Sequence, residues 1–144
     1  DNYNMDTSEV AMKLFAIGDM YVAQKKYSKA LRIYDSIYNQ FQNHSLNDDI
    51  LFRKSQVFKI QQMQDKAIDA LKQLEEEFPG SIILDKALFS IAKLYEEDLN
   101  DFESAKKYYR KILFDHPSSL YVIDARKRFR KLSGKTNQNI NKSS

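Results

Sequence analysis

The sequence contains no cysteine, two prolines and three glycines among 144 residues. Without cysteine the chain can form no disulfide, thiolate metal site or cysteine nucleophile, and it is compatible with a reducing or an oxidising compartment. The scarcity of proline and glycine, beside abundant Lys, Glu, Ala, Leu and Gln, favours helices throughout, because little interrupts the backbone hydrogen bonding. We therefore expect an all-α fold without a sheet.

Long apolar segments are also missing. No apolar run reaches about 18 residues and no basic-then-apolar leader opens the chain, so the sequence predicts neither a membrane span nor a signal peptide within it. A content of 42% hydrophobic and 30% charged residues is typical of a soluble globular domain. Because the chain begins at Asp1 and not at a methionine, we expect a processed form or a part of a longer protein.

Acidic residues are absent from the C-terminal end. The net charge of +3 is too small to give the whole surface one sign. No acidic residue follows Asp124, whereas seven basic residues do: Arg126, Lys127, Arg128, Arg130, Lys131, Lys135 and Lys142. We interpret most of them as the solvated surface of a terminal helix, where cations are favourable near the helix C-terminus. A phosphate-binding surface for nucleic acid or anionic lipid is the alternative.

What the sequence does contain is a repeat. Phe15, Phe52 and Phe89 recur at intervals of 37 residues, and other positions recur in step: Leu14, Leu51 and Leu88; Gly18, Ser55 and Ala92; Tyr21, Phe58 and Tyr95; Ala30, Ala67 and Ala105; Tyr34, Leu71 and Tyr109; Ile37, Leu74 and Ile112. The third copy has one extra residue between Tyr95 and Ala105. A period between about 20 and 50 residues is typical of solenoids, in which stacked helical pairs bury a continuous core.

Apolar residues at three- and four-residue steps predict seven helices, over 8–24, 28–41, 47–61, 64–77, 82–98, 101–115 and 119–133. Pro79 and Pro117 stand at equivalent places after the second and third pairs, because proline cannot continue a helix. The expected domain spans 8–133, with repeats over about 8–43, 44–81 and 82–118 and a capping helix over 119–133. The aperiodic segments 1–7 and 134–144 are expected to be disordered.

Small residues recur on both helices of each pair, at Gly18, Ser55 and Ala92 and at Ala30, Ala67 and Ala105. Only short side chains let two helix backbones approach closely, so these positions are expected to set the helix crossings. A bulky substitution at Ala67 should overpack the core at a cost of roughly 1 to 3 kcal/mol. The large side chains of Tyr21, Phe58 and Tyr95 are expected to fill the space beside them.

The repeated positions resemble the tetratricopeptide repeat. The matching residues are Leu14, Ile17, Gly18, Tyr21, Ala30, Tyr34 and Ile37 in the first copy; Leu51, Ser55, Phe58, Ala67, Leu71, Leu74 and Pro79 in the second; and Leu88, Ala92, Tyr95, Ala105, Tyr109, Ile112 and Pro117 in the third. The period exceeds the usual length of about 34 residues, and the first copy lacks the proline. The resemblance implies an α-solenoid of three antiparallel helix pairs and a C-terminal capping helix, stacked as a right-handed superhelix.

Two further segments resemble one branch of this family. Phe-Pro-Gly-Ser at 78–81 and His-Pro-Ser-Ser at 116–119 are similar to the repeat endings of bacterial cell-envelope proteins, namely the Tol-Pal system coordinator and the outer-membrane assembly lipoproteins. The segment 119–132 resembles the closing helix of Bacteroidetes repeat proteins. This resemblance implies a periplasmic or cell-envelope location, with the cytoplasm as the alternative.

Residues that could support catalysis or metal binding are few and poorly placed. The two histidines, His44 and His116, each lie beside a repeat boundary and lack the spacing of a metal site on one helix face. The acidic runs at 75–77 and 96–98 end helices beside lysines, which favours a solvated surface. Glycine-rich phosphate loops and nucleophile signatures are absent. We expect no enzyme activity and no cofactor.

The resemblance implies that the first helix of each pair lines a concave groove. The residues carried over to that face are Met12, Phe15, Asp19 and Val22; Asp49, Phe52, Gln56 and Lys59; and Lys86, Phe89, Lys93 and Glu96. A row of phenylalanines flanked by charges suits an extended or helical peptide. The alternative is that the phenylalanines form core between repeats.

The predicted function is therefore a protein-interaction scaffold with a protein or peptide partner, and nucleic acid is the less favoured ligand. A structural or self-associating segment without a separate ligand is an alternative from another class. The first helix lacks an evident polar outer face, so we expect preceding repeats or a partner to cover it. The sequence fixes neither the partner nor the oligomeric state.

Overall fold

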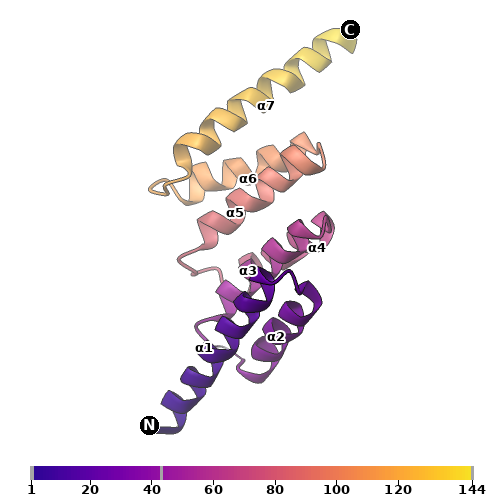
Figure 1. The fold of residues 1–144 in the computed structure, drawn as a ribbon. Helices are drawn as coiled ribbons and strands as arrows, with labels where there is room; N and C mark the ends of the chain where they lie inside the picture. Colours follow the sequence, from indigo (N-terminus) through magenta and orange to yellow (C-terminus); the bar gives the residue numbers. More distant parts are fainter. Residues whose placement is uncertain (1, 43, 144) are drawn as a thin grey trace. The chain divides into compact units, whose positions relative to one another are not determined.

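The computed structural model describes the backbone of residues 2–42 and 44–143 and the side chains of residues 7–42 and 44–134. These residues form helices and turns and contain no strand, which confirms the predicted all-α class (Figure 1). The elements are α1 (Asn2–Ala23), α2 (Tyr27–Gln40), α3 (Asn47–Ile60), α4 (Gln64–Glu77), α5 (Leu84–Lys93), the π-helical turn η1 (Leu94–Asp98), α6 (Phe102–Asp115) and α7 (Val122–Ser143).

The helices between the two ends lie within a few residues of their predicted ranges. α1 begins six residues before the predicted start, and α7 begins at Val122 and runs past the predicted end at residue 133. The disorder predicted for 1–7 and 134–144 falls almost entirely on residues 1–6 and 135–144, whose side chains lie outside the described part. It stays a prediction.

The chain divides into two compact units, residues 1–70 (unit 1) and residues 71–144 (unit 2), and each is described by itself. In unit 1, α2 packs against α1 and against α3. Their contact surface encloses a buried apolar cluster of Ala11, Ala30, Tyr34, Ile37, Ile50 and Val57. In unit 2, α6 packs against α5 and against α7. The right-handed superhelix implied by the resemblance stays a prediction.

The turn inside each helix pair has the same conformation. Lys25, Gln62 and Asn100 adopt positive φ angles of 61°, 61° and 53°. In the first two turns, the residue that follows donates its N–H to a carbonyl five residues earlier, from Lys26 to Tyr21 and from Met63 to Phe58, each at 2.8 Å. This is the left-handed closure that satisfies carbonyls at a helix C-terminus.

The third turn contains the extra residue. There the N–H of Asp101 reaches back six residues to the carbonyl of Tyr95 at 2.8 Å, and Leu99 donates to Leu94 at 3.1 Å. The backbone between Leu94 and Asp98 forms a π-helical turn. Hydrogen bonds in such a turn join residues five apart, so each turn accommodates one residue more than an α-helical turn. The additional residue between Tyr95 and Ala105 is therefore inserted into the helix and not into a loop.

The turns between helix pairs also share one pattern, although the first lacks a proline. Ser81 Oγ accepts from the N–H of Ile83 at 3.2 Å, and Ser119 Oγ accepts from Tyr121 at 3.0 Å. At the corresponding place in the first turn, His44 Nδ1 accepts from the N–H of Leu46 at 3.1 Å. His44 therefore acts as a turn residue, as a serine does in the other copies.

The small repeated residues are buried, as the sequence predicts. Ala30, Ala67, Ala92 and Ala105 have no exposed surface, and Ser55 has 4%. A Cβ atom added to Gly18 would lie 2.5 Å from Cε1 of Tyr34. The aromatic ring therefore occupies the space that any side chain at position 18 would need.

The large repeated aromatics Tyr21, Phe58 and Tyr95 are half-buried, so the expected filling of space is partial. A lysine ammonium lies over each ring: Lys29 at 5.8 Å from the Tyr21 centroid, Lys66 at 5.9 Å from Phe58 and Lys72 at 5.4 Å from Tyr95. The exposed side of each ring is thus shielded by an aliphatic stem and a cation.

Candidate functional site

The residues predicted to line the binding face differ widely in exposure. Met12, Asp49, Gln56, Lys59 and Lys86 are exposed; Phe15, Asp19, Val22 and Lys93 are half-buried; and Phe52, Phe89 and Glu96 are buried. The structure brings five of them into two clusters with residues of other helices, which are described next. The exposed residues belong to neither cluster.

In unit 1 the cluster joins α1, α2 and α3. The hydroxyl of Tyr34 donates a short hydrogen bond to Asp19 Oδ1, and Arg53 Nη2 lies 3.6 Å from Asp19 Oδ2. The Arg53 guanidinium lies over the ring of Phe15, 5.3 Å from its centroid. The rings of Phe15 and Tyr34 are 6.0 Å apart at 52°. Each charged group of this cluster thus has a partner, and the arginine also covers an aromatic face.

In unit 2 a second cluster joins α5, η1, α6 and α7. Tyr109 donates to Glu96 Oε1 at 2.6 Å, and Arg128 Nη1 lies 3.2 Å from Glu96 and 3.0 Å from Glu97. The Arg128 guanidinium lies 5.9 Å from the centroid of Phe89, and the Phe89 and Tyr109 rings are 5.9 Å apart at 61°. The partners are the same types as in unit 1, with glutamate for aspartate.

Tyr121 encloses the remaining side of Phe89. Its ring stacks on Phe89 at 4.8 Å and 26°, and the Lys93 ammonium lies 5.9 Å from the Phe89 centroid. Phe89 is 8% exposed, so little of its ring can contact another molecule. Around Phe89 the accessible surface is supplied by Lys93, Glu97 and Arg128.

The two clusters occupy equivalent repeat positions except at the carboxylate. Tyr34 and Tyr109 are 75 residues apart in sequence, as are Arg53 and Arg128. The position equivalent to Asp19 holds Lys93, one residue before η1. The carboxylate comes instead from Glu96, which lies within the π turn. The extra residue of the third copy thus allows a carboxylate to reach the equivalent tyrosine and arginine.

Sequence reasoning missed the tyrosine and arginine members of both clusters as site residues. The signal that could have found them is the shared separation of 75 residues between the two tyrosines and between the two arginines. Arg53 also follows Asp49 by four residues and precedes Gln56 by three, which places all three on one face of α3.

Burial and hydrogen bonding keep both tyrosines neutral. Burial, and then the hydrogen bond to Asp19, raises the pKa of Tyr34 far above its ordinary value of 10.0. Burial, and then the bond to Glu96, raises the pKa of Tyr109 in the same way. Burial disfavours the charged form of Arg128, but the hydrogen bonds to Glu97 and Glu96 outweigh it and raise its pKa. In both clusters a neutral phenol therefore donates to the carboxylate that also faces the arginine.

The clusters differ in solvent exposure. The side chains of Asp19 and Arg53 are 36% and 46% exposed, whereas those of Glu96 and Arg128 are 9% and 26% exposed. Water competes for the first ion pair and much less for the second. The unit 1 cluster therefore presents an accessible arginine, and the unit 2 cluster mainly holds four elements together.

No group of three or more His, Asp or Glu side chains that could bind a metal occurs among the residues whose positions are described. Over the same part of the chain, none of the helices combines the length and the apolar character needed to cross a bilayer.

Comparison of the sequence with family models identifies a tetratricopeptide repeat model. The model described as tetratricopeptide repeat matches residues 14–44, 49–81 and 86–119, which together make up more than half of the chain. No curated protein is significantly similar to the chain in sequence.

Solved structures share the fold. The TPR2AB domain of yeast Sti1, in complex with pHSP90, superposes with a TM-score of 0.73 at 17% sequence identity. The alignment covers 92% of this chain and 51% of the Sti1 chain. The first TPR of Spaghetti (RPAP3), bound to the HSP90 peptide SRMEEVD, has a TM-score of 0.65 at 20% sequence identity. The alignment covers 88% of this chain and 93% of the Spaghetti chain. A tetratricopeptide repeat protein from Parabacteroides merdae has a TM-score of 0.68 at 23% sequence identity. The alignment covers 88% of this chain and 47% of that protein's chain.

Proposed function

Because the chain belongs to the tetratricopeptide repeat family, we propose that it is a non-enzymatic protein-interaction module that binds a peptide or protein segment on the first helices of its repeats. The contact residues of unit 1 are Met12, Asp49, Arg53, Gln56 and Lys59. In unit 2 the proposed contact residues are Lys86 and Lys93. Phe52 in unit 1 and Phe89 and Glu96 in unit 2 are buried beneath the helix surfaces.

The observation that carries the proposal is the geometry of Arg53. Its guanidinium is oriented by Asp19 and by the ring of Phe15, yet 46% of the side chain remains exposed. An arginine held in one orientation before binding loses little conformational entropy when a partner arrives. Arginine is also enriched among residues that dominate binding energy. Asp49 and Gln56 on the same face supply adjacent hydrogen-bonding groups.

The similar structures agree with a peptide ligand. Two of them were solved with HSP90-derived partners, the yeast Sti1 domain and the first TPR of Spaghetti. Their sequences are at most 20% identical to this chain, so the identity of their partners does not transfer. The proposal for this chain is the class of ligand, a peptide segment, and the helices that hold it.

Selection from a phage-displayed library of random peptides tests the proposal. Peptides selected on the immobilised protein should bind the Arg53→Gln variant about tenfold more weakly, which is a typical loss at an important contact. Arg32→Gln on α2 is the matched control, because Arg32 is also an exposed arginine. Selected peptides that respond equally to both variants, or to neither, would contradict the proposed face.

A second arm separates binding from folding at the phenylalanine row. Lys93→Ala should weaken binding while circular dichroism and melting stay unchanged, whereas Phe52→Ala should also lower the melting temperature, because Phe52 is only 7% exposed. If melting falls in parallel with binding, Phe52 belongs to the core. Removing the buried ring would then lower the free energy of unfolding by about 3 to 5 kcal/mol.

We further propose that the protein acts in a bacterial cell envelope. The repeat endings at 78–81 and 116–119, which resemble those of envelope proteins, support this location. Fractionation of the natural host, with an antibody against the protein, tests it. Detection in the cytosolic fraction alone would contradict it.

The exposed apolar residues of α1 favour one alternative function, self-association. Val10, Ile17 and Met20 are spaced by seven and three residues, so they share one helix face, and all three are exposed. Sedimentation velocity across a concentration series should show dimers that Ile17→Lys abolishes. A monomer at every concentration would exclude this alternative.

A further inference from the structure

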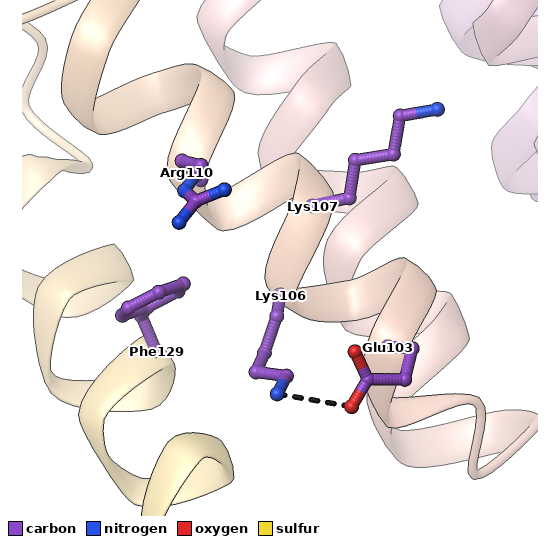
Figure 2. A pocket seen from close by; sticks show the side chains of 5 residues that line it. All are labelled: Glu103, Lys106, Lys107, Arg110 and Phe129. Atoms are coloured by element: carbon purple, nitrogen blue, oxygen red, sulfur yellow. Dashed lines mark ion pairs between the residues drawn. The ribbon is translucent and has the colours of Figure 1, made fainter.

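A cavity of about 250 Å³ lies between α6 and α7, away from the clusters described above. Its lining residues are Glu103, Lys106, Lys107 and Arg110 from α6 and Phe129 from α7 (Figure 2). Neither the predicted binding face nor the two clusters uses these side chains. We call this cavity the α6–α7 pocket.

The pocket carries an excess of positive charge. Three cations and one carboxylate line it. Lys106 Nζ lies 3.0 Å from Glu103 Oε1, so the carboxylate already has a partner. Among the described residues, neither Lys107 nor Arg110 forms an ion pair. Two positive charges are therefore available to an anionic ligand, and a partly enclosed site raises their effect relative to open water.

Phe129 gives the pocket an apolar wall with a defined orientation. The Arg110 guanidinium lies over its ring, 5.9 Å from the centroid. Figure 2 shows Lys106 and Arg110 extending from α6 on the side of Phe129, whereas Lys107 points away from Phe129. Arg110 occupies one face of this ring, so a nucleobase could stack on that face only by displacing Arg110. This arrangement disfavours single-stranded nucleic acid as the ligand.

An exposed phenylalanine extends the same face of α6. Phe114 follows Lys107 by seven residues and Arg110 by four, so these three positions lie along one side of α6. Phe114 is 75% exposed. Two cations followed by a large exposed apolar residue form a surface that matches carboxylates followed by an apolar side chain. An inorganic polyphosphate, which has no apolar group, would leave the phenylalanine without a partner.

We propose that the α6–α7 pocket and Phe114 bind an acidic peptide segment that carries an apolar residue after its carboxylates. Arg110 donates two parallel hydrogen bonds to one carboxylate, and Lys107 attracts the next carboxylate as a point charge. The apolar side chain of the ligand covers Phe114. The site lies on α6 and α7 and shares no residue with the contact residues proposed above.

Fluorescence anisotropy with a labelled peptide of four glutamates followed by leucine and phenylalanine tests the proposal on the full chain. Binding should weaken about tenfold, or 1.4 kcal/mol, in Arg110→Gln and in Lys107→Gln. It should weaken similarly in Phe114→Ser, and it should fall as salt rises. Lys127→Gln, an exposed lysine of α7 outside the pocket lining, should change it less than twofold.

Three outcomes would overturn the proposal. They are no binding of the peptide, equal binding by all variants, and tighter binding of oligothymidine than of the peptide with the same residue dependence. Arg110 touches Phe129, so a folding defect in Arg110→Gln is checked by circular dichroism. Lys107 makes no such contact, and Lys107→Gln keeps the test decisive. Because Arg53→Gln should not affect this binding, failure here leaves the first proposed function untouched.

Discussion

The hydroxyl of Tyr109 donates a 2.6 Å hydrogen bond to Glu96 Oε1, from α6 to the π turn. The same type of bond joins Tyr34 to Asp19 in the first repeat. Both tyrosines have no exposed surface, whereas the carboxylates differ, with Glu96 at 9% and Asp19 at 36% side-chain exposure. The same type of hydrogen bond therefore occurs twice, once beside an exposed carboxylate and once beside a buried one. Comparing the two measures how burial of the acceptor affects its contribution to stability.

Tyr109→Phe should destabilise the fold more than Tyr34→Phe. Removing the Tyr109 hydroxyl deprives a buried carboxylate of a donor, which typically costs about 1.5 to 3 kcal/mol. Water can reach Asp19 and replace the lost donor, so Tyr34→Phe should cost less than about 1 kcal/mol. Urea denaturation of the two variants measures the difference. Equal losses would show that burial of the acceptor does not control this bond.

Alkaline pH should weaken the fold through the same tyrosines. In the folded protein the pKa values of Tyr34, Tyr108 and Tyr109 are raised above 10.0, chiefly by burial. A group with a raised pKa contributes its full stability below its unfolded pKa of about 10, and this contribution is lost as pH rises toward the folded pKa. The urea concentration at the unfolding midpoint should therefore decrease as the pH is raised from about 9 to 11.

The double variant Tyr34→Phe with Tyr109→Phe is the control for this pH effect. It removes two of the groups whose ionisation the fold resists, so its midpoint should fall less steeply over the same interval. Absorbance at 295 nm should show part of the nine tyrosines ionising only as the protein unfolds. A smooth titration of all of them with the fold intact would contradict the burial argument.

Gly18→Ala should destabilise the first helix pair. The new methyl group would lie 2.5 Å from the Tyr34 ring, which is packed among α1, α2 and α3. Overpacking of this kind costs about 1 to 3 kcal/mol, against a gain of about 1 kcal/mol in helix propensity. Gly134→Ala on α7 is the control, because no atom lies within 4 Å of its added Cβ. Thermal melting should fall for the first variant and hold or rise for the second.

The period of 37 residues was enough to predict the helices, the turns and the small core residues. Phe15, Phe52 and Phe89 repeat with their neighbours, and only a helical repeat satisfies apolar spacing of three and four residues in every copy. The turns follow for the same reason, since each copy must reverse the chain after the same number of residues. Local pattern and global architecture agree at these positions.

The site could not be predicted as fully, and Glu96 shows why. One additional residue in the third copy fits equally well in a loop or in a helix, and only the folded backbone shows that it enters the helix as η1. Until that is known, repeat alignment assigns Lys93, not Glu96, to the position of Asp19. The pocket cations Lys106, Lys107 and Arg110 were missed for a different reason. Cations spaced by three or four residues on a helix usually form a solvated surface.

Deleting Asp98 tests whether the extra residue exists to place the carboxylate. The deletion restores the spacing of the first two copies, so the π turn should become α-helical and carry Glu96 away from Tyr109 and Arg128. Stability should fall by about as much as in Tyr109→Phe, and adding Tyr109→Phe to the deletion should cost little more, because both remove the same bond. Urea denaturation measures both quantities. Lys93→Asp added to the deletion supplies a carboxylate at the position of Asp19 and should recover part of the loss. Failure of this rescue, with additive losses for the deletion and Tyr109→Phe, would mean that the π turn serves the chain reversal alone.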